Sequence, residues 1–182
     1  MSDYSPQEHR FRFAAWAAGR AYSRGSKDLT VKNAMMALSD AGLKQLSNGL
    51  DQLPASSEEF DEAHREWRVG IIKAIGRNLS HGRSAKLINV YLKALFLSDF
   101  GSSTIVNGGS TPVDFIHPPI DRLLLLGLAK NAPRCRDEWR KLRDANWTEF
   151  DQQKYENVIE LVRETTGGKL WKIEEYWPVT GR

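Results

Sequence analysis

The chain has 182 residues, which is enough for one domain with a hydrophobic core or for two small helical lobes that share one. Hydrophobic residues make up 41% of it and no apolar run approaches the length of a membrane span, so we expect neither a disordered nor a membrane protein. The formal net charge of +3 is compatible with nucleic-acid binding but does not argue for it alone.

The N-terminal third has the apolar periodicity of helices. Residues 10–24 form a predicted helix whose apolar face consists of Phe13, Trp16, Ala17 and Ala21. Gly25 is expected to end it, and Thr30 to cap a second helix with its apolar positions at Ala34, Met35 and Leu38. Gly42 interrupts this pattern, and a further short helix is expected around Leu46.

A long helix is predicted to begin where Ser56 and Glu59 have capping-box spacing. Its core stripe is expected at Phe60, Ala63, Trp67, Ile71 and Ala74. The opposite face, which includes Arg65 and Arg68, is expected to be solvated, and His64 has no expected role.

The next helix has its apolar stripe at Leu87, Val90, Tyr91, Ala94 and Leu95. Lys86, Asn89 and Lys93 share a different face of that helix. Residues 98–115, rich in Gly and Ser, are expected to form a long loop, and long loops in compact domains are often functional.

Prolines indicate where the C-terminal helices begin. Pro118 and Pro119 suit a helix start, because the first turn has no partner for their missing N–H groups, and Pro133 is expected to begin another helix with Trp139 inward. A last long helix begins near Asp151 and ends at 167–168. No convincing strand is found, so we predict one all-α domain over residues 1–182, a compact multi-helix bundle.

Residues 79–122 contain the parts of a possible reaction centre. Gly82, Arg83 and Ser84 can form a tight turn that opens a helix and presents N–H groups to a phosphate. An amine can displace a base and form an imine with the sugar, and Lys86 is expected in a helix first turn, where the dipole disfavours a positive charge. Asp121, after two prolines, can stabilise positive charge that develops on the sugar.

Each of these parts also has an ordinary structural interpretation. The turn at Gly82 has the features of a plain helix–helix connector, Lys86 those of a solvated surface lysine, and Asp121 those of an acid at a helix N-terminus. The joint order of the three favours the chemical interpretation.

In order and local context, Gly82, Lys86 and the run Pro119-Ile120-Asp121-Arg122 resemble the DNA glycosylases of the helix-hairpin-helix superfamily. The archaeal 8-oxoguanine glycosylases and their bacterial relatives look closest, and the resemblance covers about a quarter of the chain. It implies two helical lobes around a cleft, with Lys86 as Schiff-base nucleophile and Asp121 as catalytic carboxylate. The usual Gly-x-Gly turn is here Gly-Arg-Ser, and the lack of further cysteines excludes the iron–sulfur branch.

Further residues are assigned around this pair. The expected DNA contacts are His81, Gly82, Arg83, Ser84, Lys93 and Arg122. A flipped base needs an aromatic partner, and the expected base pocket consists of His117, Trp171 and Trp177. We expect no metal and no cofactor. The expected partner is duplex DNA with one base flipped out, bound by a monomer.

The sequence therefore predicts a DNA glycosylase, with associated AP-lyase activity through Lys86 as one form of it. The base is either a damaged one, in DNA repair, or a modified base of phage DNA, in defence. A helical nucleic-acid-binding module without chemistry and a protein-interaction domain are the alternatives. Residues 1–6 lack the apolar core of a secretion signal, so we expect a cytoplasmic protein, and the single Cys135 is expected to be an inert thiol.

Overall fold

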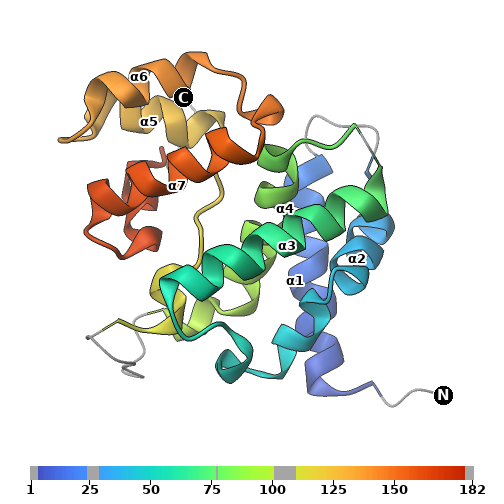
Figure 1. The fold of residues 1–182 in the computed structure, drawn as a ribbon. Coiled ribbons are helices and arrows are strands. Elements are labelled where there is room, and N and C mark those ends of the chain that lie inside the picture. Colours follow the sequence, from blue (N-terminus) through green and yellow to red (C-terminus); the bar gives the residue numbers. More distant parts are fainter. Residues whose placement is uncertain (1–3, 24–28, 77, 101–109, 179–182) are drawn as a thin grey trace.

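The computed structural model describes residues 4–23, 29–76, 78–100 and 110–178. Within these ranges every regular element is a helix, which confirms the predicted all-α fold (Figure 1). The α-helices are α1 Pro6–Ser23, α2 Val31–Asp40, α3 Ser57–Ile75, α4 His81–Leu95, α5 Arg122–Asn131, α6 Arg136–Asp144 and α7 Gln152–Thr166. The 3₁₀ helices are η1 Leu43–Asn48, η2 Leu50–Gln52, η3 Leu97–Asp99, η4 Pro112–Phe115, η5 Trp147–Glu149 and η6 Leu170–Tyr176. No helix in the described ranges is long and apolar enough to cross a membrane.

Side-chain caps begin α2, α3 and α7 where the sequence predicted them. The Thr30 hydroxyl accepts the backbone N–H of Asn33 at the start of α2, and the Ser56 hydroxyl accepts that of Glu59 at the start of α3. Asp151 caps α7 in the same way. The C-terminus of α7 is also as predicted, because Gly167 adopts the left-handed conformation there with φ 65°.

Other helix starts differ from the prediction. Helix α1 begins at Pro6, before residue 10, because the Ser5 hydroxyl accepts the N–H of Glu8. Helix α5 begins only at Arg122, since residues 118–120 continue without helical structure up to the cap residue Asp121. Helix α6 begins at Arg136 instead of Pro133. The predicted helix stop Gly25 and much of the predicted 98–115 loop lie outside the described residues.

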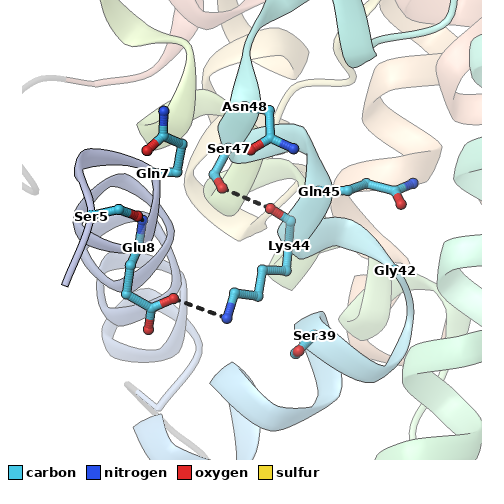
Figure 2. Close-up of a pocket in the computed structure, with 9 residues that line it drawn as sticks. All are labelled: Ser5, Gln7, Glu8, Ser39, Gly42, Lys44, Gln45, Ser47 and Asn48. Carbon is cyan, nitrogen blue, oxygen red and sulfur yellow. Dashed lines mark hydrogen bonds and ion pairs between the residues drawn. The ribbon is translucent and has the colours of Figure 1, made fainter. Parts of the chain in front are cut away.

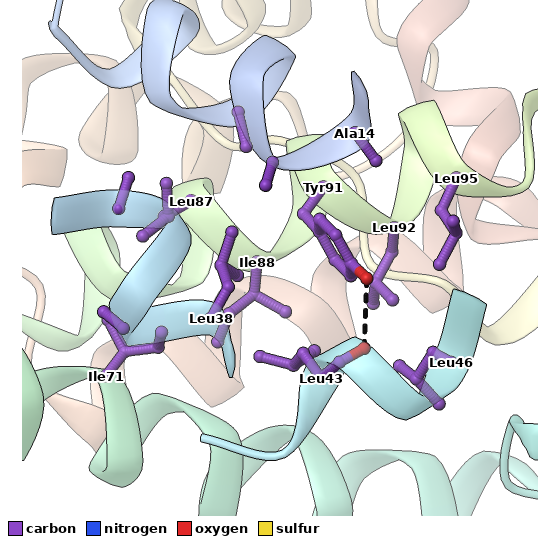
Figure 3. Close-up of a cluster of buried hydrophobic side chains, with 14 of the residues drawn as sticks. Ala14, Leu38, Leu43, Leu46, Ile71, Leu87, Ile88, Tyr91, Leu92 and Leu95 are labelled. Carbon is purple, nitrogen blue, oxygen red and sulfur yellow. Dashed lines mark hydrogen bonds between the residues drawn. The ribbon is translucent and has the colours of Figure 1, made fainter. Parts of the chain in front are cut away.

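Buried hydrophobic side chains form two clusters. The first cluster is built by α1 to α4 with η1, and includes Leu43, Ile88 and Tyr91, whose hydroxyl donates to the Leu43 carbonyl at 3.0 Å (Figure 3). The second is built by α5 to α7 with η6, and α4 contributes Ala85 to it. Helix α4 therefore packs into both clusters.

The predicted apolar face of α1 is wrong. Phe13 and Trp16 are 58% and 50% exposed, whereas the buried residues of α1 are Phe11, Ala14, Ala15, Ala18 and Tyr22. The alanines let α1 approach α4 closely, and Phe11 packs edge-on against the ring of Tyr91. Small side chains thus decide which face is buried here, because they allow a close helix–helix contact.

The predicted solvated face of α3 is partly buried. His64 is fully buried and Arg68 is only 1% exposed, whereas Ala74, expected in the core, is exposed. Helix α7 covers this face of α3: the Arg68 guanidinium donates to Glu156 at 2.9 Å and lies 4.6 Å from the centre of the Tyr155 ring. The charge of Arg68 is thereby paired and stacked, which makes its burial tolerable.

Candidate active site

The Lys86 amine and the Asp121 carboxylate meet between α4 and α5. Lys86 Nζ lies 3.1 Å from Asp121 Oδ2, and their side chains are only 14% and 11% exposed. The two groups therefore lie in direct contact, although they are 35 positions apart in the chain. Lys86 is in the second turn of α4, which begins at His81, and not in the first. The dipole of α4 consequently acts on it less than expected.

Asp121 has a second partner for its other oxygen. It is the N-cap of α5, and its Oδ1 accepts the backbone N–H groups of Leu123 and Leu124 at 3.0 and 3.1 Å. These bonds fix the carboxylate orientation, so that Oδ2 faces Lys86. Asp121 was expected inside the first turn of its helix, and the cap position instead gives it two fixed N–H donors.

Asn89 fixes the spacing between the helix that carries Lys86 and the segment that carries Asp121. Asn89 is fully buried one turn after Lys86, and its Nδ2 donates to the Pro118 carbonyl at 2.8 Å. Pro118 lies three residues before Asp121, so the bond ties the approach to α5 directly to α4. The pair is thus held by a buried hydrogen bond as well as by its own attraction.

The same asparagine belongs to a buried network of rings. Asn89 Nδ2 also donates to the Tyr155 hydroxyl at 3.0 Å, and Asn89 Oδ1 lies 2.8 Å from His64 Nε2. Because the Pro118 carbonyl only accepts, the amide nitrogen must face it, and His64 Nε2 must therefore donate to Oδ1. Burial lowers the pKa of His64 well below its usual value, with the nearby His117 adding to the effect.

His117 anchors the segment that leads to Asp121. The Tyr155 hydroxyl oxygen accepts a hydrogen bond from Asn89, so its O–H donates to His117 Nδ1 at 3.0 Å. The proton of the His117 ring is therefore on Nε2, which donates to Asp61 at 2.8 Å. Burial lowers the pKa of His117, which keeps the ring neutral as this pattern requires. Burial alone would raise the pKa of Asp61, but His117 and Arg163 outweigh it and the pKa is lowered.

His117 therefore does not lie where the sequence placed it. It was expected in a base pocket with Trp171 and Trp177, but it is buried and lines a separate small cavity of about 110 Å³ beside Arg68 and Arg163. Its neighbours Tyr155 and Asp61 saturate its two nitrogens. Its contacts make it a structural anchor between α3, α7 and the 116–121 segment.

The backbone at the start of α4 is not available to a phosphate. The Gly82 N–H donates to the Phe150 carbonyl at 3.0 Å, the Arg83 N–H donates to the hydroxyl of the cap residue Ser80, and the Ser84 N–H donates to the Ser80 carbonyl. The Ser84 side chain is fully buried and donates to the His81 carbonyl. The expected backbone grip at Gly82, Arg83 and Ser84 is therefore wrong, because tertiary and capping contacts occupy its donors.

The expected side-chain contacts to DNA differ in their availability. Arg122 is exposed directly beside Asp121. Arg83 is partly exposed, with its guanidinium 5.0 Å from the centre of the Tyr22 ring. His81 is partly buried, and burial, followed by the charge of Arg68, lowers the pKa of its imidazole. Arg122 is thus the most exposed of the side chains expected to contact DNA.

A groove lies further along α4 beside Lys93. Its volume is about 710 Å³, and its lining residues include Lys93, Phe100 and Trp171. Lys93, expected to contact a phosphate, forms an ion pair with Glu174, and its Nζ lies 5.7 Å from the centre of the Trp177 ring. Lys93 follows Lys86 by seven residues, so it lies on the same face of α4, about 10 Å further along. Trp171 and Trp177 are therefore gathered near Lys93.

Trp147 is the site residue that sequence reasoning missed. It belongs to η5, and Lys86 Nζ lies 4.8 Å from the centre of its ring. The ring is partly buried and packs against the second hydrophobic cluster. The local sequence around Trp147 gives no sign of this contact, because Lys86 lies far away in the chain.

Other lysine–carboxylate pairs among the described residues, such as Lys44–Glu8 and Lys93–Glu174, are more exposed to solvent than Lys86 and Asp121. A polar pocket of about 650 Å³ between α1 and η1 contains Lys44 and Glu8, which form an ion pair at 2.9 Å (Figure 2). No cluster of three or more metal-ligating side chains occurs among the described residues. Burial, together with the nearby Glu164, raises the pKa of the Cys135 thiol, which disfavours a reactive thiolate.

Comparisons of the chain with protein-family models, with curated proteins and with solved structures give no match. The residues of the candidate site therefore have to supply the argument for a function.

Proposed function

We propose that this protein is a DNA glycosylase that removes a damaged or modified base, with Lys86 as nucleophile and Asp121 as catalytic carboxylate. The proposal rests on one observation: Lys86 Nζ lies 3.1 Å from Asp121 Oδ2, in a position largely removed from solvent. An amine that attacks a sugar carbon needs an acceptor for its proton and a negative group near the developing positive charge. Asp121 offers both in a fixed orientation.

The reaction begins with the transfer of a proton from the Lys86 ammonium to Asp121. The Nζ lone pair then forms a bond to C1′ of a flipped nucleotide as the bond between C1′ and the base breaks. The base leaves with the electron pair and takes the proton from Asp121, which restores the carboxylate. In the lyase form, a proton then moves from Nζ to O4′ as the C1′–O4′ bond breaks, and Nζ and C1′ become an iminium ion.

The surroundings of the pair support DNA as the substrate. Arg122 is exposed next to Asp121 and can bind a phosphate of the target strand. The groove beside Lys93 lies about 10 Å along α4 from Lys86, so the ring of Trp171 there can stack on the base of a neighbouring nucleotide. In this proposal the protein holds the DNA backbone through arginine side chains, since the amides at the start of α4 are occupied.

The proposal includes two roles, namely repair of a damaged base and attack on a modified base of phage DNA. A binding module without chemistry is the second candidate, and the cap bonds of Asp121 favour it. In that case the ion pair only joins α4 to α5, and the affinity for DNA falls with salt.

The test measures base release from duplexes that each carry one candidate base. The wild-type protein releases one of them, and Lys86→Gln releases none. Lys154→Gln removes the same charge from the exposed face of α7 and retains full activity, which makes it the matched control. In Asp121→Asn the cap is conserved, because Asn caps helices as well as Asp, while base release falls about 100-fold or more.

The results separate the candidates. Undiminished release by Asp121→Asn removes Asp121 from the mechanism. Salt-dependent binding of DNA without release of any base assigns the binding module. A lack of affinity for DNA contradicts both and leaves a protein-interaction domain.

A further inference from the structure

Lys86 faces an aromatic ring as well as a carboxylate. Its Nζ lies 4.8 Å from the centre of the Trp147 ring and 3.1 Å from Asp121 Oδ2. The face of an aromatic ring carries partial negative charge, so a cation over it is stabilised. The amine therefore has one full and one partial negative partner.

The start of α4 holds Trp147 in this position. The Ser80 hydroxyl donates to the Thr148 carbonyl at 2.5 Å, and the Gly82 N–H donates to the Phe150 carbonyl at 3.0 Å. The segment lies so close to Gly82 that a Cβ added there would be only 2.2 Å from the Trp147 carbonyl oxygen. The same helix thus carries Lys86 and fixes the ring that covers it.

We propose that Trp147 is a positioning residue that keeps the Lys86 nitrogen beside Asp121 and stabilises the positive charge of that nitrogen during the reaction. This inference rests on the proposed glycosylase function. Nζ is positively charged in the resting ammonium, in the adduct that forms when it bonds to C1′, and in the iminium ion. The ring stabilises the resting ammonium as well as the later cations, so its effect on the rate comes from holding the amine beside Asp121.

A purely structural role of Trp147 requires only that its ring fill space against the second hydrophobic cluster. In that case the loss of the ring lowers stability but leaves the chemistry of Lys86 unchanged. A positioning role predicts two further effects. The Lys86 nitrogen senses the ring current of the indole, and the formation of the covalent intermediate slows when the ring is removed.

The experiment uses the full chain and two readouts. In the first, lysine amines are dimethylated with ¹³C-formaldehyde, and the Lys86 signal is assigned by its loss in Lys86→Arg. In the wild type this signal is displaced upfield, and Trp147→Leu returns it to the range of the other lysines. In the second, the rate of borohydride trapping on a duplex with an abasic site falls about 2- to 30-fold in Trp147→Leu, the range that corresponds to one cation–π contact.

Two variants control for folding and for aromatic loss. Trp147→Phe keeps an aromatic face and is expected to recover most of the trapping rate, which a space-filling role alone does not require. Trp16→Leu removes a half-exposed tryptophan of α1, and is expected to trap at the wild-type rate. Thermal unfolding of each variant shows that the comparison is made between folded proteins.

The outcomes distinguish this inference from the proposed function. If Lys86→Gln abolishes trapping while Trp147→Leu traps at the wild-type rate, the role of Trp147 is refuted and the glycosylase proposal stands. If the wild type never traps DNA, the glycosylase proposal fails, and the stabilisation of an intermediate fails with it. If the Lys86 signal shows no displacement in the wild type, the ring does not hold the amine and the inference is refuted.

Discussion

The substitution Asn89→Ala tests how the candidate site is held together. Asn89 has no exposed surface, and its side chain bonds to Pro118, Tyr155 and His64. Truncation leaves the Pro118 carbonyl and the His64 Nε2–H buried without these partners, whereas Tyr155 keeps its bond to His117. Two polar groups thus lose their hydrogen bonds in a place that water does not reach.

The expected loss of stability follows from those two groups. A buried donor or acceptor that is left unsatisfied costs about 1 to 3 kcal/mol, so Asn89→Ala is expected to lower the free energy of unfolding by about 2 to 6 kcal/mol. Domains are generally stable by only about 5 to 15 kcal/mol, so this is a large fraction of the total. Because the Asn89–Pro118 bond also sets the approach to Asp121, base release is expected to fall further than stability alone explains.

Urea unfolding followed by circular dichroism measures the change. Asn157→Ala is the matched control, since Asn157 is an exposed asparagine within α7, and it is expected to change stability by about 0.5 kcal/mol or less. Equal midpoints for Asn89→Ala and Asn157→Ala would refute the reasoning, because they would mean that the buried network contributes nothing.

Three further predictions concern acid, packing and capping. Burial lowers the folded-state pKa values of His64 and His117, so the stability they contribute is fully present above pH 6.5, the usual pKa of histidine. Below that pH the free energy of unfolding is expected to fall by up to about 1.4 kcal/mol per pH unit for each of the two histidines. Thermal unfolding at several pH values measures this fall, and a flat profile from pH 7 to 5 contradicts it. Gly82→Ala is expected to lower the free energy of unfolding by about 1 to 3 kcal/mol, because the new methyl group clashes with the Trp147 carbonyl. A urea midpoint equal to that of the wild type would show that the segment around Trp147 shifts without loss of stability. Asp121→Ala and Asp121→Asn both lose the ion pair with Lys86, but only Asp121→Ala also loses the α5 cap, so it is expected to be less stable than Asp121→Asn by about 0.5 to 2 kcal/mol. Equal losses in the two variants would argue against the cap.

Local signals in the sequence were sufficient for the fold class and for several helix ends. Thr30, Ser56 and Asp151 act through contacts with N–H groups three residues away, so their effect can be predicted without the tertiary structure. The same holds for Gly167, which only has to adopt a left-handed conformation. The lysine and the aspartate of the candidate site were found from their order and context in the chain.

The faces that helices bury could not be predicted in this way. Hydrophobic periodicity favoured Phe13 and Trp16 as core residues of α1, but a close contact with α4 required the alanine face. The same periodicity assigned Arg68 to solvent, because it gives no information about Glu156 and the ring of Tyr155 on α7. A buried polar residue is determined by partners that are distant in sequence.

The surroundings of the candidate pair depend on long-range contacts for the same reason. Gly82 was assigned to a phosphate, whereas it is needed for the close approach of the segment that carries Trp147. The sequence alone does not distinguish a glycine that binds a phosphate from one that lets another segment pack closely. Asn89 stands between Ile88 and Val90 in an otherwise apolar stretch, and a polar residue there was the available sign of a buried network.

The most direct test of the central claim is to find which atom of the protein becomes bound to DNA. The wild-type protein is incubated with a duplex that carries an abasic site, reduced with borohydride and digested, and the peptide joined to the nucleotide is sequenced by mass spectrometry. The proposed function predicts a single cross-link, at Lys86, which is absent from Lys86→Gln and retained in Lys154→Gln. A cross-link at another lysine, or none at all, would contradict the assignment of Lys86 as the nucleophile.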